Sequence, residues 1–310
     1  MDKYNFSVGK IAAVIVTYNR LEKLKKALYY YENQRYKPDY MVIVDNASTD
    51  GTANWLEEWR NSRHEYQVDV IRTDKNLGGS GGFYLGEKRA MELPVDWIML
   101  SDDDAYLAED YIQGLVQYIE KHKGDNISAI CGAVEQNGSY CSNQRRLYKK
   151  IKWQLEFLYN VPAGDYKGKV IYIDNASYLG IMINKKKLTQ VGLVDKDFFI
   201  WWDDTEHLMR LRNAGSIICI PNCVIKHDVE LSNSGLSWKS YYGARNKLIS
   251  HKRHFPMIFP IIVVYFTVKT LLCPLKGRSF KEVLLRLTAV KDALMGNMGM
   301  NDVYKPGWKP

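Results

Sequence analysis

The stretch IAAVIVTYNRLEKLKKALYYYENQ (Ile11–Gln34) indicates the architecture of this 310-residue chain. It opens with a short apolar run that stops at polar residues, the pattern of a strand buried on both faces. Its second half repeats apolar residues along one helical face, at Leu21, Leu24, Leu28 and Tyr31, and so predicts a helix. A buried strand leading directly into an amphipathic helix is the building unit of a parallel sheet covered by helices.

The same alternation of strand and helix continues to about residue 134. Four more buried strands are predicted within the stretches YMVIVDNASTDGT, VDVIRT, VDWIML and ISAICGAV. The helices between them are predicted at Thr52–Arg60, from the glycine loop NLGGSGGF to about Met91, and over AEDYIQGLVQYIEKH. Consecutive units of this kind give an α/β fold with a doubly wound, mostly parallel sheet and helices on both faces.

The second half of the chain is less regular. Residues 135–170 contain many glycine, asparagine and lysine residues and are predicted to form an irregular insertion or flap. Strands are then expected in NASYLGIMIN, SIICI and CVIKH, and helices in KKKLTQVG and Asp204–Ala214. From Ser237 to about Met295 the pattern is helical, so a helical C-terminal region should follow the α/β domain.

The net charge of +8 is concentrated in that C-terminal region. From Gly235 onward there are 13 Lys and Arg against 3 Asp and Glu, so the rest of the chain is close to neutral. The uncharged stretch FPMIFPIIVVYFTV (Phe255–Val268) has 14 residues, too few to span a bilayer. We therefore predict basic, amphipathic helices lying on an anionic membrane surface, with an oligomer interface as the alternative. No recognition motif accompanies the charge, so no nucleic-acid partner is expected.

The N-terminus, MDKYNFSVGK, has no apolar signal region, and the five cysteines include no CxxC pair. The odd number of cysteines without such a pair argues against a disulfide framework or a zinc knuckle and favours a reducing compartment. The absence of a signal region from this stretch predicts the cytoplasmic side. The chain is accordingly expected on the cytoplasmic side, associated peripherally with the inner leaflet of the cell membrane.

Polar residues gather where predicted strands end, at Thr17–Arg20, Asp45–Asp50, Asn76–Gly82 and Asp102–Asp104. Because ligands of doubly wound sheets bind at the carboxyl ends of the strands, these clusters are expected to form one site. Glycines in the third cluster would let backbone approach a ligand, with a plain tight turn as the alternative. Asp45 would hold a base edge or a ribose hydroxyl, with an Asx-turn made by Asn46 or Asp50 as the alternative.

Asp102 and Asp104 are separated by one residue at a strand end, so both carboxylates can reach one cation. Their oxygens favour Mg²⁺ or Mn²⁺, which would neutralise a departing diphosphate. His227 ends a later strand and would complete a Mn²⁺ shell if that strand end faced Asp104. The alternatives are a structural histidine and a helix cap made by Asp104 for a helix beginning near Leu107.

The stretch FIWWDDTEHLMRLRNAG (Phe199–Gly215) places aromatic and carboxylate side chains next to each other. Trp201 and Trp202 offer flat apolar surfaces for sugar rings, although one of the two can equally pack in the core. The carboxylates that follow supply candidates for a general base that takes a proton from a hydroxyl. Arg210 falls one turn after Glu206 and can orient its carboxylate.

Together, the motifs VIVTYNR, VDNASTDGT, NLGGSGGF, LSDDDA and FFIWWDDTEHLMRLRNAG resemble family 2 glycosyltransferases in order and spacing, over roughly residues 10–250. The resemblance implies the nucleotide-sugar-binding GT-A fold, a Rossmann-like α/β sheet. Within the family, NLGGSGGF, WWDDTEH and the later His227 are most similar to galactofuranosyltransferases of bacterial cell-surface polysaccharides. The rhamnosyltransferase branch is the near neighbour.

The resemblance also implies roles for individual residues. The donor would be bound by Thr17, Tyr18, Arg20, Asp45, Asn46, Asn76, Gly78, Gly79, Asp102 and Asp103. Mn²⁺ or Mg²⁺ would be held by Asp102, Asp104 and His227, and the acceptor would contact Trp201 and Trp202. Asp204 aligns with the catalytic base and stands with Asp203 and Glu206 as the catalytic group. The family usually has glutamate at position 203, so either aspartate is a candidate for the base.

The implied activity is that of an inverting, metal-dependent hexosyltransferase. It would move galactofuranose from UDP-galactofuranose to a glycan hydroxyl, with the acceptor carried on a polyprenyl lipid. The alternatives are a dTDP-rhamnose-dependent rhamnosyltransferase and a non-catalytic nucleotide-sugar-binding protein. A nucleotidyltransferase is disfavoured because the first loop, VTYNRLEK, has no glycine.

The implied domain division follows the same resemblance. Residues 1–235 would form the GT-A catalytic domain, and residues 236–310 the helical region at the membrane surface. The segment SWKSYYGARNKL would close over the donor or the acceptor. A homo-oligomer is left open.

Overall fold

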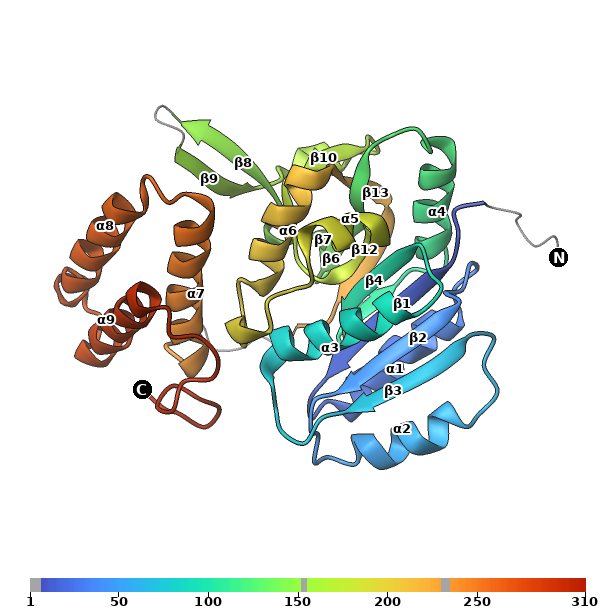
Figure 1. The fold of residues 1–310 in the computed structure, drawn as a ribbon, viewed down its shortest axis with the longest axis horizontal. Coiled ribbons are helices and arrows are strands. Elements are labelled where there is room, and N and C mark those ends of the chain that lie inside the picture. The colour runs from blue at the N-terminus through green and yellow to red at the C-terminus, as the bar shows by residue number, and fades with distance from the viewer. Residues whose placement is uncertain (1–6, 152–154, 230–234) are drawn as a thin grey trace.

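The computed structural model describes residues 7–151, 155–229 and 235–310 (Figure 1). The first six residues, which the sequence predicts to carry no signal region, lie outside this range. The main path of the large sheet runs β10-β13-β6-β12-β4-β1-β2-β3, with β5 beside β13 and β7 beside β6. Its strands are β1 (Ile11–Thr17), β2 (Tyr40–Asp45), β3 (Gln67–Arg72), β4 (Trp97–Asp102), β5 (Ala105–Leu107), β6 (Ile127–Gln136), β7 (Ser139–Tyr140), β10 (Ile171–Ile173), β12 (Leu179–Asn184) and β13 (Ser216–His227).

The pairing within this sheet confirms the predicted doubly wound, mostly parallel α/β architecture. Strand β1 pairs in parallel with β2 and β4, β2 pairs in parallel with β3, and β6 pairs in parallel with β13. Strand β12 lies antiparallel between β4 and β6. The parallel strands therefore end at a common edge, where their loops can meet.

All seven residues of β1 are buried because helices cover both faces of the sheet. Ile11, Ala13 and Ile15 belong to the core beneath α1, α2 and α4, whereas Ala12 and Val14 belong to the core beneath α3, α5 and α6. Burial on both faces is the reason that the strand is apolar throughout instead of alternating. The helices are α1 (Leu21–Glu32), α2 (Thr52–Arg60), α3 (Gly78–Glu92), α4 (Tyr111–Lys121), α5 (Lys185–Val191) and α6 (Asp203–Ala214).

The segment 135–170 is more ordered than the sequence predicts. Apart from residues 152–154, which lie outside the described range, it forms an antiparallel hairpin of β8 (Arg145–Ile151) and β9 (Leu155–Asn160), joined by β11 (Asn175–Ala176). The fully buried Arg145 donates hydrogen bonds to the Gly132 and Leu179 carbonyls and so fixes the hairpin to the main sheet. The prediction of an irregular flap was wrong because β8 is largely polar and has no apolar alternation to reveal it.

Two predicted boundaries are also corrected. SIICI and CVIKH form one strand, β13, whose pairing with β6 shifts register between Ile220 and Val224. The residues after Asp104 form β5, and α4 begins only at Tyr111, so Asp104 does not cap a helix near Leu107.

The C-terminal region folds into α7 (Trp238–His254), α8 (Phe259–Leu271) and α9 (Phe280–Met295), which confirms the helical pattern. Figure 1 shows this group beside the sheet domain, with α7 next to α6. Phe198 and Phe199, just before α6, pack into the apolar clusters formed by these helices. Among the described residues, none of the helices has both the length and the apolar character needed to cross a bilayer.

Candidate active site

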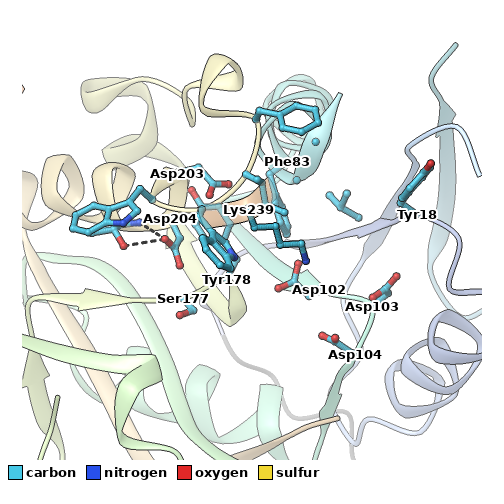
Figure 2. Close-up of a pocket in the computed structure, with 18 of the residues that line it drawn as sticks. Tyr18, Phe83, Asp102, Asp103, Asp104, Ser177, Tyr178, Asp203, Asp204 and Lys239 are labelled. Atoms are coloured by element: carbon cyan, nitrogen blue, oxygen red, sulfur yellow. Dashed lines mark hydrogen bonds between the residues drawn. The ribbon is translucent and has the colours of Figure 1, made fainter. Parts of the chain in front are cut away.

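A cavity of about 800 Å³ opens where the loops at the carboxyl ends of the parallel strands meet, a volume suited to a small-molecule ligand. Figure 2 shows Asp102–Asp104 on one side of it and Asp203 and Asp204 on the other. The predicted site residues that line it are Thr17, Tyr18, Arg20, Asn46, Asn76, Gly78, Gly79, Asp102, Asp103, Asp104, Trp201, Trp202, Asp203, Asp204 and His227. Four loop clusters that are distant in the sequence therefore border one cleft. Two of the predicted residues, Asp45 and Glu206, are not part of its lining.

Three consecutive aspartates at the end of β4 form the acidic floor of this cavity. Thr17 Oγ1 donates to Asp103 at 2.7 Å, and Arg20 donates to Asp103 at 3.1 Å and to Asp104 at 2.9 Å. Burial raises the pKa of Asp103 to about 6 against the opposing effect of Arg20. Loss of hydration, together with the charges of Asp104 and Asp103, raises the pKa of Asp102 well above its usual range.

The predicted metal ligands are brought near one another. His227 Nε2 lies 3.4 Å from Asp104 Oδ1, and Asp102 lines the same cavity. Nδ1 of His227 is buried without a hydrogen-bond partner among the described residues. Within that same part of the chain, however, no three His, Cys, Asp or Glu side chains converge as a formed metal cluster. The metal site therefore stays a prediction.

The charges that line the cavity do fit a divalent cation. Among the residues that the structure describes, five aspartates line it together with three basic side chains, those of Arg20, Arg146 and Lys239. Two carboxylates and an imidazole are a donor set that Mn²⁺ accepts, and the negative excess favours such an ion.

The loops after β2 and before α3 are tied together by asparagines. Asn46 Nδ2 donates to Asn76 Oδ1 at 3.1 Å and to the Gly78 carbonyl at 2.9 Å, and its Oδ1 accepts from the Leu77 amide. Gly78 has φ 74°, and a Cβ there would lie 2.0 Å from the Phe199 carbonyl oxygen. A Cβ on Gly79 would meet nothing within 4 Å. The backbone conformation and the contact with Phe199 therefore require glycine at position 78. At position 79 the absence of a side chain leaves open space beside the cavity.

Asp45 is fully buried behind the cavity wall. Its Oδ1 accepts from the Ser48 amide at 2.9 Å, and Arg72 Nε lies 3.6 Å from Oδ2. These contacts shape the turn after β2. In the same loop Asp50 makes the Asx-turn that was the alternative, because its Oδ1 accepts from the Thr52 amide at 3.2 Å. A contact of Asp45 with a base or a ribose stays a prediction.

Asp203 and Asp204 open α6, where the positive end of the helix dipole favours carboxylates. Asp203 is buried, and burial and the Asp204 charge raise its pKa to about 7. The Asp204 side chain is 22% exposed, accepts from Thr205 Oγ1 at 3.0 Å, and has Arg146 3.8 Å from its Oδ2. Of the two, Asp204 has the more accessible carboxylate for a substrate hydroxyl.

Glu206 points away from the cavity toward α7. Its carboxylate accepts from Arg210 Nε at 3.2 and 3.1 Å, as the helical spacing predicted, and lies 3.1 Å from His254 Nε2. Burial opposes ionisation, but the hydrogen bonds and charges of His254 and Arg210 outweigh it and lower the pKa of Glu206 to about 2. Glu206 therefore joins α6 to α7, and this position gives no geometric support to a catalytic role.

The two tryptophans differ, although both line the cavity. Trp201 is 47% exposed, so it presents a ring face to a ligand. Trp202 packs against the cluster that contains Phe198 and Leu248, with its ring centroid 5.8 Å from that of His251. The tryptophan that packs in a core, which the sequence left undecided, is therefore Trp202.

Several cavity residues were not identified from the sequence. They are Phe83, Asn143, Gln144, Arg146, Asn160, Ser177, Tyr178, Trp238 and Lys239. Lys239, at the start of α7, extends toward Asp102 in Figure 2. Only Trp238 and Lys239 were indicated by the sequence, because the segment SWKSYYGARNKL was expected to close over a substrate. Arg146 and its neighbours come from the hairpin predicted to be irregular.

A buried network lies beneath this cavity. Tyr178 OH is 2.7 Å from His207 Nδ1, and His207 Nε2 is 3.2 Å from the Gly192 carbonyl. Burial and the charge of Arg210 lower the pKa of His207 to about 3, so the ring is neutral. Its Nε2–H must then donate to the carbonyl, and its Nδ1 accepts from the tyrosine. Burial raises the pKa of Glu87, whose Oε1 is 3.5 Å from His207 Nδ1, to about 8.

Comparison with known proteins finds relatives of this chain in sequence and in fold. The chain is 27% identical over 208 residues to galactofuranosyltransferase GlfT1 of Mycolicibacterium smegmatis, covering 66% of this chain and 66% of that relative. It is 25% identical over 310 residues to dTDP-rhamnosyl transferase RfbF of Shigella flexneri, covering 94% and 97%. The structure of GalNAc-T7 with UDP, GalNAc and Mn²⁺ superimposes with a TM-score of 0.66 at 14% identity, over 95% of this chain and 57% of that one.

The structural likeness confirms the predicted GT-A fold. The family model described as glycosyl transferase family 2 matches residues 12–180, more than half of the chain. That range holds the first four motifs and the aspartates of β4, which form the acidic side of the cavity. This chain therefore belongs to glycosyl transferase family 2.

Proposed function

We propose that this glycosyltransferase inverts the configuration of the sugar it transfers, and that it moves galactofuranose from UDP-galactofuranose to a hydroxyl of a lipid-linked glycan in cell-surface polysaccharide synthesis. The observation that carries the proposal is one cavity lined by both Asp102–Asp104 and Asp203–Asp204. The similarity to GlfT1 supports the choice of donor sugar.

In this proposal the acceptor hydroxyl attacks the anomeric carbon from the face opposite the diphosphate. Asp204 accepts the hydroxyl proton as the new C–O bond forms, and the bonding electrons of the old C–O bond leave with UDP. Arg146 and Thr205 hold the Asp204 carboxylate at the cavity wall. Trp201 supplies an apolar face for the acceptor sugar.

The leaving diphosphate belongs at the opposite, acidic side of the cavity. Asp102, Asp104 and His227 would hold a Mn²⁺ or Mg²⁺ ion there, which supplies charge neutralisation for the diphosphate when bound. Lys239 extends toward the same side and adds a positive charge within reach of the leaving group. Thr17 and Arg20 keep Asp103 in place.

A dTDP-rhamnose-dependent rhamnosyltransferase is the second candidate. The match to RfbF covers 94% of this chain and 97% of that relative, a longer match than the one to GlfT1. A donor screen by thermal shift separates the two candidates. UDP and UDP-galactofuranose should raise the melting temperature in Mn²⁺ and have little effect in EDTA, whereas dTDP should not stabilise the chain. Stabilisation by dTDP-rhamnose instead would favour the second candidate, and no response to any nucleotide would contradict both.

We also propose that the C-terminal helices contact the membrane that carries the acceptor. Apolar side chains are strongly exposed along α8 and up to α9, among them Met257 at 91%, Leu275 at 82% and Phe280 at 81%. Basic residues lie in the same stretch, at Lys269, Lys276, Arg278 and Lys281. Exposed apolar surface with basic neighbours is suited to an anionic bilayer surface.

Vesicle flotation tests this contact. The chain should float with vesicles rich in phosphatidylglycerol and less with pure phosphatidylcholine. The double variant Leu275→Glu/Phe280→Glu should lose flotation, whereas Tyr29→Glu, an exposed aromatic on α1, should not. Equal flotation of all three proteins, or self-association through these helices without any flotation, would refute the membrane contact.

A further inference from the structure

The segment that precedes α6 has an unusual backbone. Phe199, Trp201 and Trp202 have φ values of 68°, 63° and 70°, the left-handed region that bulky residues rarely adopt. Such conformations persist only where the surrounding structure imposes them, and they gather at functional sites. Here they directly precede the two aspartates of the cavity wall.

The contacts that impose this backbone come from α7. Asn246 Nδ2 faces three carbonyl oxygens of the segment, those of Phe198 at 2.9 Å, Ile200 at 2.9 Å and Trp201 at 2.8 Å. Its Oδ1 accepts from Arg245 Nε at 2.9 Å, which fixes the orientation of the amide. The opposite orientation would place an oxygen against three oxygens and a nitrogen donor against a guanidinium.

Arg245 adds a second set of donors to the same segment. It donates to the Phe198 carbonyl at 3.1 Å and reaches across to the Gly299 carbonyl at 2.7 Å. Arg245 and Asn246 are 1% and 0% exposed, and the guanidinium lies over the rings of Tyr241 and Tyr242. Burying an arginine is energetically unfavourable unless its N–H groups form hydrogen bonds. The hydrogen bonds of the buried Arg245 therefore indicate that it has a structural role at this segment.

The other side of the segment meets the glycine loop at Asn76–Gly82, which is the predicted donor loop. The Phe199 carbonyl accepts from the Ser80 amide at 3.2 Å and occupies the space that any side chain at Gly78 would need. The Trp202 carbonyl accepts from the Glu206 amide at 2.9 Å, which begins the hydrogen bonding of α6. The segment is therefore wedged between α7 and the glycine loop, and its backbone sets where Trp201 and the first turn of α6 lie.

We infer that Arg245 and Asn246 are positioning residues for the transfer reaction. They hold residues 198–202 in a backbone, left-handed at three of its positions, that presents Trp201, Trp202 and Asp204 to the cavity. We call the contacts of Arg245 and Asn246 with residues 198–202 the clamp. The link to transfer rests on the proposed function, whereas the clamp itself does not. The C-terminal helical region is then part of the catalytic apparatus and more than an attachment to a membrane.

Hydrogen exchange tests the clamp without any substrate. In Asn246→Ala, the amides of Ser80, Ile200 and Glu206 should exchange at least about tenfold faster, because their acceptors lie in residues 198–202. The control is Tyr241→Phe, which removes a buried 2.6 Å hydrogen bond from the same helix to Asp292 but none to the segment. If Asn246→Ala does not fold, Asn246→Asp keeps the volume and the contact to Arg245 and removes the donor.

A second-site change distinguishes positioning from general stability. Glycine adopts positive φ without strain, and Trp201 is the exposed tryptophan of the pair, so Trp201→Gly added to Asn246→Ala should restore part of the slow exchange. Unchanged exchange in the Asn246 variants, or exchange that rises equally in Tyr241→Phe, would overturn the clamp.

The link to catalysis is tested by the rate at which the enzyme releases UDP from the donor that the wild-type chain turns over. The rate is measured well below the melting temperature of each variant. The Asn246 variants should release UDP at least about tenfold more slowly with UDP affinity held within about threefold. Unchanged release beside faster exchange would remove the catalytic role and leave a structural one. A wild-type chain that turns over no donor would instead count against the proposed function, and the exchange measurements would still decide the clamp.

Discussion

The two walls of the cavity are built by different means. The wall at Thr17, Asn46 and Asp102–Asp104 consists of loops at the ends of neighbouring parallel strands, joined by short hydrogen bonds between those loops. The wall at residues 198–204 follows no strand and is held by Asn246 of α7, more than forty residues later in the chain. Sheet topology fixes the first wall, and contact with the C-terminal region fixes the second. Changes in the second wall should therefore reduce turnover more than they reduce donor affinity.

The largest expected effect comes from Asp204→Asn in the second wall. The amide keeps the size of the side chain and cannot accept the acceptor proton, so kcat should fall by about 10²–10⁴-fold. Donor affinity should stay within about twofold, since no strand-end loop is altered. Steady-state transfer assays and calorimetric titration with UDP measure the two quantities.

The matched control is Asp203→Asn, one residue earlier on the same helix. Asp203 is buried, and burial and the Asp204 charge raise its pKa to about 7, so its amide replaces a group that is readily protonated near neutral pH. A smaller loss of kcat is expected. If Asp203→Asn proved the more damaging of the two, the base assignment would move to position 203.

Within the second wall, Trp201 and Trp202 are expected to have different roles, one in acceptor binding and the other in stability. Trp201→Ala should raise the acceptor KM by about fivefold, in line with an aromatic contact worth roughly 1 kcal/mol, and change the melting temperature little. Trp202→Ala should destabilise the fold by about 2 kcal/mol because its ring packs against the helical cluster. Chemical denaturation and acceptor kinetics separate the effects, and the reverse pattern would mean that Trp202 faces the acceptor.

Much of the first wall was predictable from the sequence. Continuous apolar runs such as Ile11–Val16 reveal strands buried on both faces, and polar residues after them mark the ligand edge of the sheet. Thr17, Asn46, Gly79 and Asp102 were found in this way or through the family motifs, and all of them line the cavity.

The second wall was predictable only in part. The motif WWDD identifies the residues, but their left-handed backbone depends on Asn246, whose contacts no local pattern reveals. Asp45 and Glu206 have suitable chemistry, yet they lie outside the cavity lining because a turn and a helix contact use their carboxylates. Arg146 was missed because its polar strand lacks the alternation that a half-buried strand normally shows.

A pH-dependent effect on stability should come from Glu87, which connects the two walls. It lies on α3, behind the donor loop, accepts from the Val194 amide at 2.8 Å and sits 3.5 Å from His207 on α6. Burial raises its pKa from 4.5 to about 8, so the folded chain keeps a proton that the unfolded chain releases above about pH 4.5. The contribution of Glu87 to stability should therefore fall as the pH rises from about 4.5 to about 8 and change no further above that range.

Glu87→Gln should remove this pH dependence, because the amide keeps the acceptor for Val194 and has no proton to lose. Each unit of pKa difference corresponds to about 1.4 kcal/mol, so the variant should be more stable than the wild type by a few kcal/mol near pH 8 and nearly equal near pH 4. Urea denaturation across that range measures the difference, with Glu92→Gln on the exposed part of α3 as the control. If the difference in stability between the wild type and Glu87→Gln stayed constant with pH, Glu87 would be ionised in the folded chain. The two walls would then be joined by a charged contact instead of a neutral one.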